Sequence, residues 1–157
     1  MARVKTLRDH PLFADLSDAE LAVIAAVADE KRLPEGTTVF LENMPGESMF
    51  IVKMGRVKIS KKLDSGGEKL LLTLGPNEIF GEMALFDGGP RGTTARIAEP
   101  SEVLIIKRSD VMALAEKEPR AVLKLVLAIG RAFVGRLREQ HDAFREIVRA
   151  APPPQAS

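Results

Sequence analysis

The residues with the clearest chemical potential lie together in residues 79–95, whose sequence is IFGEMALFDGGPRGTTA. Gly81 allows a ligand to approach the backbone closely, and residues 82–85 can form a helical turn whose free amides point at an anion. Arg91 carries a permanent charge in a planar fork that can hold two phosphate oxygens at once. Such an anion would repel Glu82 unless this carboxylate accepts hydrogen bonds from a neutral group, and a ribose hydroxyl fits that requirement.

This segment resembles the phosphate-binding cassette of the cyclic nucleotide-binding domain family, in which F-G-E-x-A-L precedes P-R and small or hydroxyl residues. Seven matching positions occur in one register, so the resemblance is more specific than a lone glycine motif. It implies that Arg91 binds the cyclic phosphate, that Glu82 binds the 2'-hydroxyl, and that backbone amides surround the phosphate oxygens. The ligand site implied by the resemblance consists of Gly81, Glu82, Met83, Ala84, Arg91, Gly92 and Thr93.

The resemblance covers residues 12–148. Residues 34–36 resemble the family's entry to its β-roll, residues 45–52 its central hairpin, and residues 55–59 the strand that follows. Asn43 stands where the family often has glycine, and asparagine can also adopt a left-handed conformation. The implied fold is α+β, with an antiparallel, jelly-roll-like β-roll, an N-terminal helix and two C-terminal helices.

The pattern of the chain as a whole indicates the same order of elements. Ser17 and Glu20 fit a capping box at the start of a helix over residues 18–29, and Pro34 and Gly36 end the helical pattern. Short stretches between turn residues then predict strands at 37–41, 49–53, 56–62, 68–73, 93–98 and 102–107. This spacing favours a closed or rolled antiparallel sheet.

Helical periodicity returns after the last predicted strand. Ser109 can cap a short helix to about residue 116, and Pro119 suits the first turn of a long helix to about residue 149. Apolar residues recur at spacings of three and four along the long helix, except for one seven-residue step that contains Gln140 and His141.

The long helix also supplies candidates for contact with the base or for a lid over the ligand: Arg136, Gln140 and His141. In related transcription activators, hydroxyl residues near these positions contact the adenine, and Gln140 and His141 stand in their place. Gln140 and His141 could instead set the register of a helix pair, or all three side chains could simply face solvent.

Simpler interpretations of the cassette residues are also open on the sequence alone. Arg91 could pair with Asp87 or Glu82 at the surface, and the adjacent glycines could provide only loop flexibility. Thr93 and Thr94 could be ordinary strand residues. On a strand, the side chain of Thr93 would point to the face opposite that of the preceding residue.

The composition predicts one domain and excludes several chemistries. The chain has 157 residues, of which 45% are hydrophobic and 29% charged, and a formal net charge of +1. We expect a single domain over residues 1–150, with an N-terminal helical segment (1–32), a β-roll (33–108) and C-terminal helices (109–150), followed by a disordered tail (151–157). Cysteine is absent and the two histidines are far apart, which disfavours disulfides, metal sites and catalytic triads.

The expected compartment and partners follow from the charge and hydropathy of the sequence. The N-terminus has no apolar signal segment, and the most apolar stretches are too short to span a membrane, so we expect a cytoplasmic protein. A net charge of +1 gives no general attraction to nucleic acid. The expected partners are a cyclic nucleotide, an unidentified effector protein and a second copy bound through the C-terminal helix.

We therefore expect a sensor rather than an enzyme, with no cofactor other than its ligand, and with C-terminal helices that move when the ligand binds. cAMP is favoured over cGMP, because family members that favour cGMP usually carry threonine where this sequence has Gly92. A hydrolase would need a metal cluster or a base and nucleophile set. The sequence is also compatible with a DNA-associated regulator and with a ligand-independent scaffold or dimerisation module of the same fold.

Overall fold

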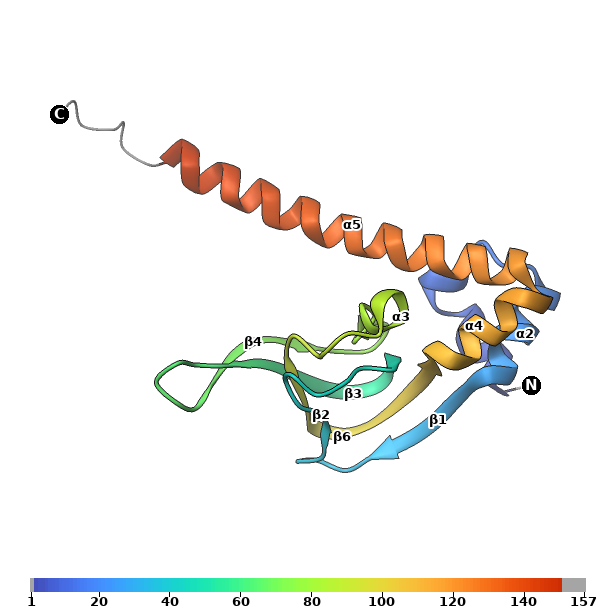
Figure 1. Cartoon of the computed structure of the whole chain (residues 1–157), viewed down its shortest axis with the longest axis horizontal. Helices are drawn as coiled ribbons and strands as arrows, with labels where there is room; N and C mark the ends of the chain where they lie inside the picture. Colours follow the sequence, from blue (N-terminus) through green and yellow to red (C-terminus); the bar gives the residue numbers. More distant parts are fainter. Residues whose placement is uncertain (1, 151–157) are drawn as a thin grey trace.

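The computed structural model describes residues 2–150, in which helices from both ends of the chain flank an antiparallel sheet (Figure 1). The N-terminal elements are α1 (Ala2–Arg8), the short 3-10 helix η1 (Pro11–Phe13) and α2 (Asp18–Val27). The helices after the sheet are α4 (Arg108–Lys117) and α5 (Pro119–Ala150), and α3 (Ala84–Asp87) lies within the cassette segment. The predicted tail, residues 151–157, lies outside the described residues.

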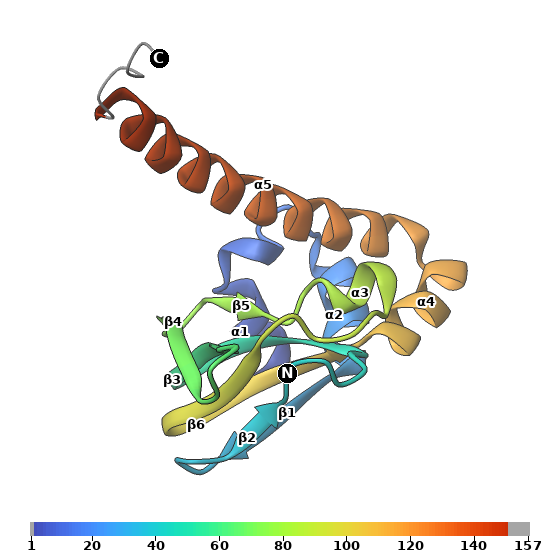
Figure 2. The ribbon, with the colours of Figure 1, turned by 60° about the vertical axis from the view of Figure 1, so that its left-hand side comes forward.

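Within residues 2–150 the sheet has six strands and is antiparallel throughout. The main strand order is β1-β6-β3-β4, while β2 pairs with β6 and β5 pairs with β3. The strands are β1 (Ala28–Leu33), β2 (Thr38–Phe40), β3 (Ser48–Lys62), β4 (Glu68–Leu74), β5 (Ile79–Phe80) and β6 (Thr94–Lys107). The rolled sheet and the helices that precede and follow it in the sequence confirm the predicted fold class (Figure 2).

Two predicted helix boundaries are wrong. The helix predicted to reach residue 29 ends at Val27, and Ala28–Leu33 is a strand that pairs residue by residue with β6. Four of its six residues are exposed, so this edge strand lacks the alternating apolar pattern that would have revealed it. The predicted cap at Ser109 is also wrong, because α4 already begins at Arg108 and its N-cap, Lys107, makes no side-chain cap hydrogen bond.

Two pairs of predicted strands are in fact continuous strands. β6 joins the strands predicted at 93–98 and 102–107. β3 spans both 49–53 and 56–62, and its pairing with β6 shifts register between Val52 and Val57. Gly55 lies in this bend with φ 98°, and a Cβ at Gly55 would collide with the Ser101 hydroxyl on β6. Glycine therefore permits the close crossing of the two strands, and the predicted turn is a bend within a strand.

The apolar interior consists of two clusters. One cluster packs the helices against the end of the sheet, and its members include Phe13, Ile24, Met49, Ile106, Leu125 and Ile129. The second cluster fills the roll, and its members include Phe50, Val52, Val57, Phe80, Ile97 and Val103. The first cluster fixes the sheet relative to the first turns of α5, whereas the second contains no residue of that helix.

α5 is divided into a docked half and a projecting half. The buried residues of α5 all fall between Ala121 and Ile129, and the residues from 135 to 150 are exposed. In Figure 1 the projecting half of α5 diverges from the roll toward the C-terminus. No helix within residues 2–150 has the length and apolar character of a membrane-spanning segment.

Ion pairs reinforce the docked half of α5. The Lys124 ammonium lies 2.7 Å from Glu20 Oε1, and the Arg131 guanidinium lies 2.8 Å from Asp15 Oδ2. Glu20 also forms the predicted capping box with Ser17, which the structure confirms. One carboxylate thus caps α2 and connects α2 to α5.

This arrangement predicts a specific dependence of stability on pH. The hydrogen bond from Lys124, supported by that from the Ser17 amide, lowers the pKa of Glu20 from 4.5 to about 2. A carboxylate whose pKa is lower in the folded state stabilises the fold above its ordinary pKa, and this contribution is lost as the pH falls toward the folded-state pKa. We therefore expect Glu20→Gln to lose less stability than the wild type between about pH 5 and pH 2, measured from urea unfolding midpoints.

Glu35→Gln is the matched control, because Glu35 is an exposed carboxylate for which the described residues provide no ion pair. This variant should retain the wild-type loss of stability. An unchanged pH dependence in Glu20→Gln would contradict the role assigned to the ion pair with Lys124.

Candidate functional site

The cassette is held in place by the loop between β2 and β3, which is distant in sequence. Asn43 N–H donates to Arg91 O (2.7 Å), Arg91 N–H donates to Met44 O (2.8 Å), and Gly46 N–H donates to Gly89 O (3.1 Å). Asn43 has φ 71°, the left-handed conformation that its place in the sequence suggested. Backbone pairing therefore fixes where the Arg91 side chain begins.

All seven ligand residues implied by the resemblance lie around one cavity of about 260 Å³: Gly81, Glu82, Met83, Ala84, Arg91, Gly92 and Thr93. β5 pairs with β3 immediately before Gly81, which brings residues 81–84 to the mouth of the roll. Gly81 has φ 70°, and α3 ends at Gly88 with φ 63°, so both turns use conformations that suit glycine. The fold thus gathers both ends of the cassette around a single cavity.

Arg91 is buried, with an exposed fraction of only 8%. Its Nη1 donates to Gly81 O (3.0 Å) and its Nη2 donates to Ser48 O (2.8 Å), while its guanidinium carbon lies 4.2 Å from the centroid of the Phe40 ring. Among residues 2–150 no carboxylate forms an ion pair with Arg91, and its buried Nε has no hydrogen-bond partner. The surface ion pair considered for Arg91 is therefore wrong.

The buried position of the Arg91 side chain depends on two glycines packed against it. A Cβ at Gly81 would lie 2.6 Å from Arg91 Nη1, and a Cβ at Gly46 would lie 2.9 Å from Arg91 Nε. Burial lowers the pKa of Arg91 and the nearby Glu82 charge raises it, but an arginine still carries its charge at any ordinary pH. The cavity is consequently lined by a fixed cation that can accept an anionic partner.

The backbone amides near Arg91 differ in their bonding. Ala84 N–H points back to Gly81 O at 3.3 Å, so this amide closes a turn. For the amides of Met83 and Gly92, residues 2–150 provide no hydrogen-bond acceptor. The site therefore has donors without protein partners beside a buried guanidinium, a combination that favours an anion.

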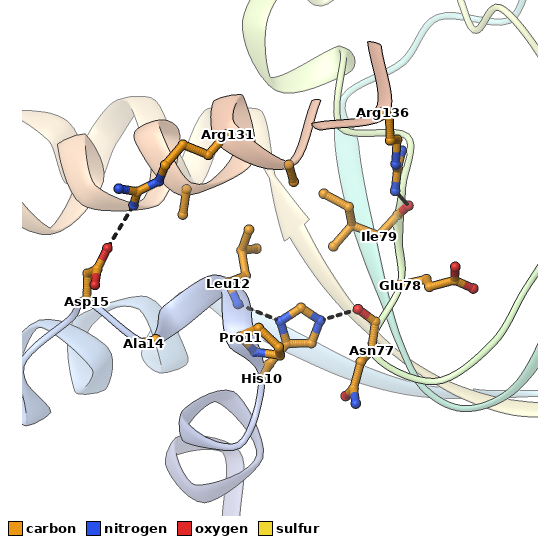
Figure 3. A pocket seen from close by; sticks show the side chains of 12 residues that line it. His10, Pro11, Leu12, Ala14, Asp15, Asn77, Glu78, Ile79, Arg131 and Arg136 are labelled. Carbon is orange, nitrogen blue, oxygen red and sulfur yellow. Dashed lines mark hydrogen bonds and ion pairs between the residues drawn. The ribbon is translucent and has the colours of Figure 1, made fainter. Parts of the chain in front are cut away.

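Glu82 is also buried, and its partner comes from α5. Its Oε1 accepts a hydrogen bond from Arg136 Nη1 at 2.7 Å, and Arg136 Nη2 donates to Ile79 O at 2.8 Å. Figure 3 shows the second of these bonds. The sequence predicted Arg136 as a contact to the base. In the structure it instead bonds to Glu82, the carboxylate that the resemblance assigns to the ribose.

A second cavity of about 420 Å³ adjoins the first and is lined by Phe40, Gly81, Glu82 and Thr93 in common with it. Arg136 and Gln140 line its α5 side, together with Glu139, which the sequence analysis did not select. His141 lines neither cavity and is exposed on α5. The sequence contains no signal for Glu139, because its position depends on where the helix crosses the roll.

The expectation that Thr93 points to the opposite face of a strand is wrong. β6 begins at Thr94, so the alternation of side chains in a strand does not include Thr93, which lines both cavities. Thr94 is the buried strand residue, and its hydroxyl accepts a hydrogen bond from Glu42 N–H at 2.9 Å. Phe40 and Gly46 were also missed as site residues, because only the folded chain brings them to Arg91.

The described residues contain no group of three or more His, Asp or Glu side chains arranged to hold a metal ion. The site consists instead of a buried arginine, a buried glutamate, free amides and an apolar wall, on a rolled antiparallel sheet. These features define a site for a small anionic ligand with a neutral polar part.

Comparison with known proteins identifies the family. The cyclic nucleotide-binding domain model matches residues 30–118, which is more than half of the chain, so the protein belongs to that family. The family's domain is a regulatory ligand-binding domain and not a catalytic one.

Individual relatives agree with this assignment. The chain is 32% identical to the cyclic AMP receptor protein of Thermus thermophilus, over 85% of this chain and 60% of that protein. It is 27% identical to the CRP-like cAMP-activated global transcriptional regulator of Mycobacterium tuberculosis, over 87% of this chain and 59% of that protein. The chain therefore spans about three fifths of the length of these curated relatives.

Solved structures show the same fold. The N-terminal domain of a transcriptional regulator from Streptomyces coelicolor superposes with a TM-score of 0.73 at 34% identity, covering 88% of this chain and 94% of that one. The catabolite activator protein of Thermus thermophilus superposes with a TM-score of 0.75 at 29% identity, covering 88% of this chain and 63% of that one.

Proposed function

We propose that this domain binds cAMP in the two adjoining cavities and that binding changes the contacts of α5. The single observation that carries the proposal is the buried Arg91 guanidinium, which faces the smaller cavity without an acidic partner among the described residues. A cyclic phosphate bears one negative charge on oxygens that suit a planar guanidinium and free amides. The phosphate then occupies the cavity of about 260 Å³, and the base extends toward the larger one.

Glu82 connects the proposed ribose position to α5. The Oε1 atom bonds to Arg136, whereas Oε2 has no hydrogen-bond partner within residues 2–150 and can accept a ribose hydroxyl. A ligand that shifts Glu82 therefore changes a contact of 2.7 Å with α5. Coupling requires that this contact differ between the free and bound states, since a ligand shifts only states to which it binds with different affinity.

The first test concerns the phosphate contact. A hydrogen bond to a charged group contributes about 1.5 to 3 kcal/mol, so Arg91→Ala should weaken cAMP binding by roughly 10- to 150-fold in a calorimetric titration. Arg96→Ala is the control, because Arg96 is a β6 arginine that pairs with Glu68 and lines neither cavity. Equal cAMP affinities for Arg91→Ala and the wild type would refute the assignment of Arg91 to the phosphate. A wild-type protein that binds none of cAMP, cGMP and cyclic di-GMP would favour a ligand-independent scaffold.

The second test concerns selectivity for cAMP over cGMP. Gly92 has no side chain that could bond the guanine amino group, and one such hydrogen bond is worth about 0.5 to 1.5 kcal/mol, so we expect a preference of roughly 2- to 13-fold. Thr93 lines both cavities, and its hydroxyl can partly replace the one that a threonine at position 92 would provide. We therefore expect the preference for cAMP to lie at the lower end of this range. In competition titrations Gly92→Thr should narrow the preference, and a cGMP dissociation constant equal to or below that of cAMP contradicts the selectivity.

The projecting half of α5 predicts self-association. Its apolar stripe continues beyond the docked half, and the exposed fractions are 48% for Leu137, 61% for Phe144 and 55% for Val148. Gly130 and Gly135 each cost about 1 kcal/mol relative to alanine in a helix, and at both positions a Cβ would meet open space, so a second helix can approach there.

We therefore expect a dimer by light scattering at high micromolar concentration, and Phe144→Glu should shift it toward monomer by placing charge in the contact. Glu146→Gln, two residues further along α5, is the control. A monomer mass for the wild type with and without cAMP rules out this interface.

A further inference from the structure

A buried histidine that the ligand site does not use lies between two other cavities. His10 is 7% exposed, and its ring lines one cavity of about 490 Å³ next to α5 and another of about 210 Å³ next to β3 (Figure 3). It packs edge-to-face on Phe13, with 5.8 Å between ring centroids. Both apolar and charged side chains line these two cavities.

Both ring nitrogens of His10 are engaged. Nδ1 accepts a hydrogen bond from Leu12 N–H at 3.0 Å, and Nε2 lies 2.6 Å from Asn77 O. Since a carbonyl only accepts and an amide N–H only donates, the ring must be neutral, with its proton on Nε2. A protonated ring would place a second N–H against the amide of Leu12 and would lose the cap of η1.

The contact with Asn77 ties the N-terminal segment to the loop that leads into the cassette. This loop is well anchored on its other side, because Asn77 N–H donates to Val52 O at 2.8 Å and Val52 N–H donates to Glu78 O at 2.9 Å. Two residues after Asn77, Ile79 O accepts the hydrogen bond from Arg136. His10 therefore connects η1 to residues 77–79, which Arg136 of α5 also contacts.

Charged side chains of both signs line the cavities beside His10, and none of them bonds to its ring. Three acidic and three basic side chains line the two cavities that it borders: Asp9, Asp15, Glu78, Lys53, Arg131 and Arg136. The bases and Asp15 are already in ion pairs, since Asp15 pairs with Arg131, Arg136 with Glu82, and Lys53 with acids of β1 and β6. Burial lowers the pKa of His10 below its ordinary value of 6.5, and the bond to Asn77 opposes this shift only in part.

We propose that His10 is a pH-sensitive clamp that holds residues 10–16 against residues 77–79, and that acidification releases this N-terminal segment. In the released state the imidazole is hydrated and titrates near the ordinary histidine pKa of about 6.5, whereas the two hydrogen bonds of the clamped state require the neutral ring. Protonation therefore favours the released state as the pH falls below 6.5. Between pH 7.5 and pH 5.5 the equilibrium constant for release should rise by up to about tenfold.

Amide hydrogen exchange on the ligand-free protein tests this proposal independently of the proposed ligand. The amides of Phe13, Ala14 and Leu16 are bonded within the segment, so their protection factors, corrected for the intrinsic pH dependence of exchange, report its release. We expect these factors to fall by up to about tenfold from pH 7.5 to pH 5.5 relative to those of core amides in β3 and β6.

The two histidines of the chain provide matched variants. His141→Gln, on the exposed part of α5, should behave like the wild type. His10→Gln keeps a neutral donor and acceptor and should lose the pH dependence at these amides. Equal protection in the wild type at both pH values, or the same loss in His10→Gln as in the wild type, overturns the proposal.

A second measurement decides the question if His10→Gln does not fold. An NMR titration of the wild-type ring should give a pKa for His10 below 6.5, as the direction of the shift requires. A measured pKa at or above 6.5 would overturn the clamp.

Discussion

The site depends on one constraint, the burial of the Arg91 charge without a protein anion paired to it among the described residues. Removing an ion from water costs several kcal/mol, and here two carbonyls and the face of Phe40 offset part of that cost. These neutral groups hold the guanidinium in place but leave its charge uncompensated. The fold thus holds a preorganised cation beside the smaller cavity, where the anionic ligand that we propose would supply the opposite charge.

The same constraint explains why separate segments of the roll converge on Arg91. The loop at residues 43–46 fixes its backbone, the start of β3 provides one carbonyl, and the turn after β5 provides the other. Gly46 and Gly81 are required there because a side chain at either position would occupy the space of the guanidinium. The bend at Gly55 likewise requires glycine, but for a different contact, since a Cβ there would collide with Ser101 on β6.

Local chemistry made the cassette, the capping box at Ser17 and the conformation of Asn43 predictable from the sequence, because each depends on residues that are near neighbours. β1 was not predictable in the same way, since its charged residues form a strand only by pairing with β6, about seventy positions away. The roles of Phe40, Glu139 and Gly46 likewise depend on how the strands and α5 cross. Arg136 lines the larger cavity, and its bond to Glu82 depends on the depth at which α5 docks.

Residues 77–82 form contacts with segments from both ends of the chain. His10 from the N-terminal segment bonds Asn77, and Arg136 from α5 bonds both Ile79 and Glu82. The part of α5 nearer its N-terminus is anchored by its buried apolar residues and by two ion pairs. Lys124 pairs with α2, and Arg131 pairs with the segment before α2. A shift of residues 77–82 would therefore leave the docked half of α5 in place while changing contacts at its projecting half and at η1. The proposed effect of ligand binding on α5 therefore predicts that the contacts of η1 change as well, because both depend on residues 77–82.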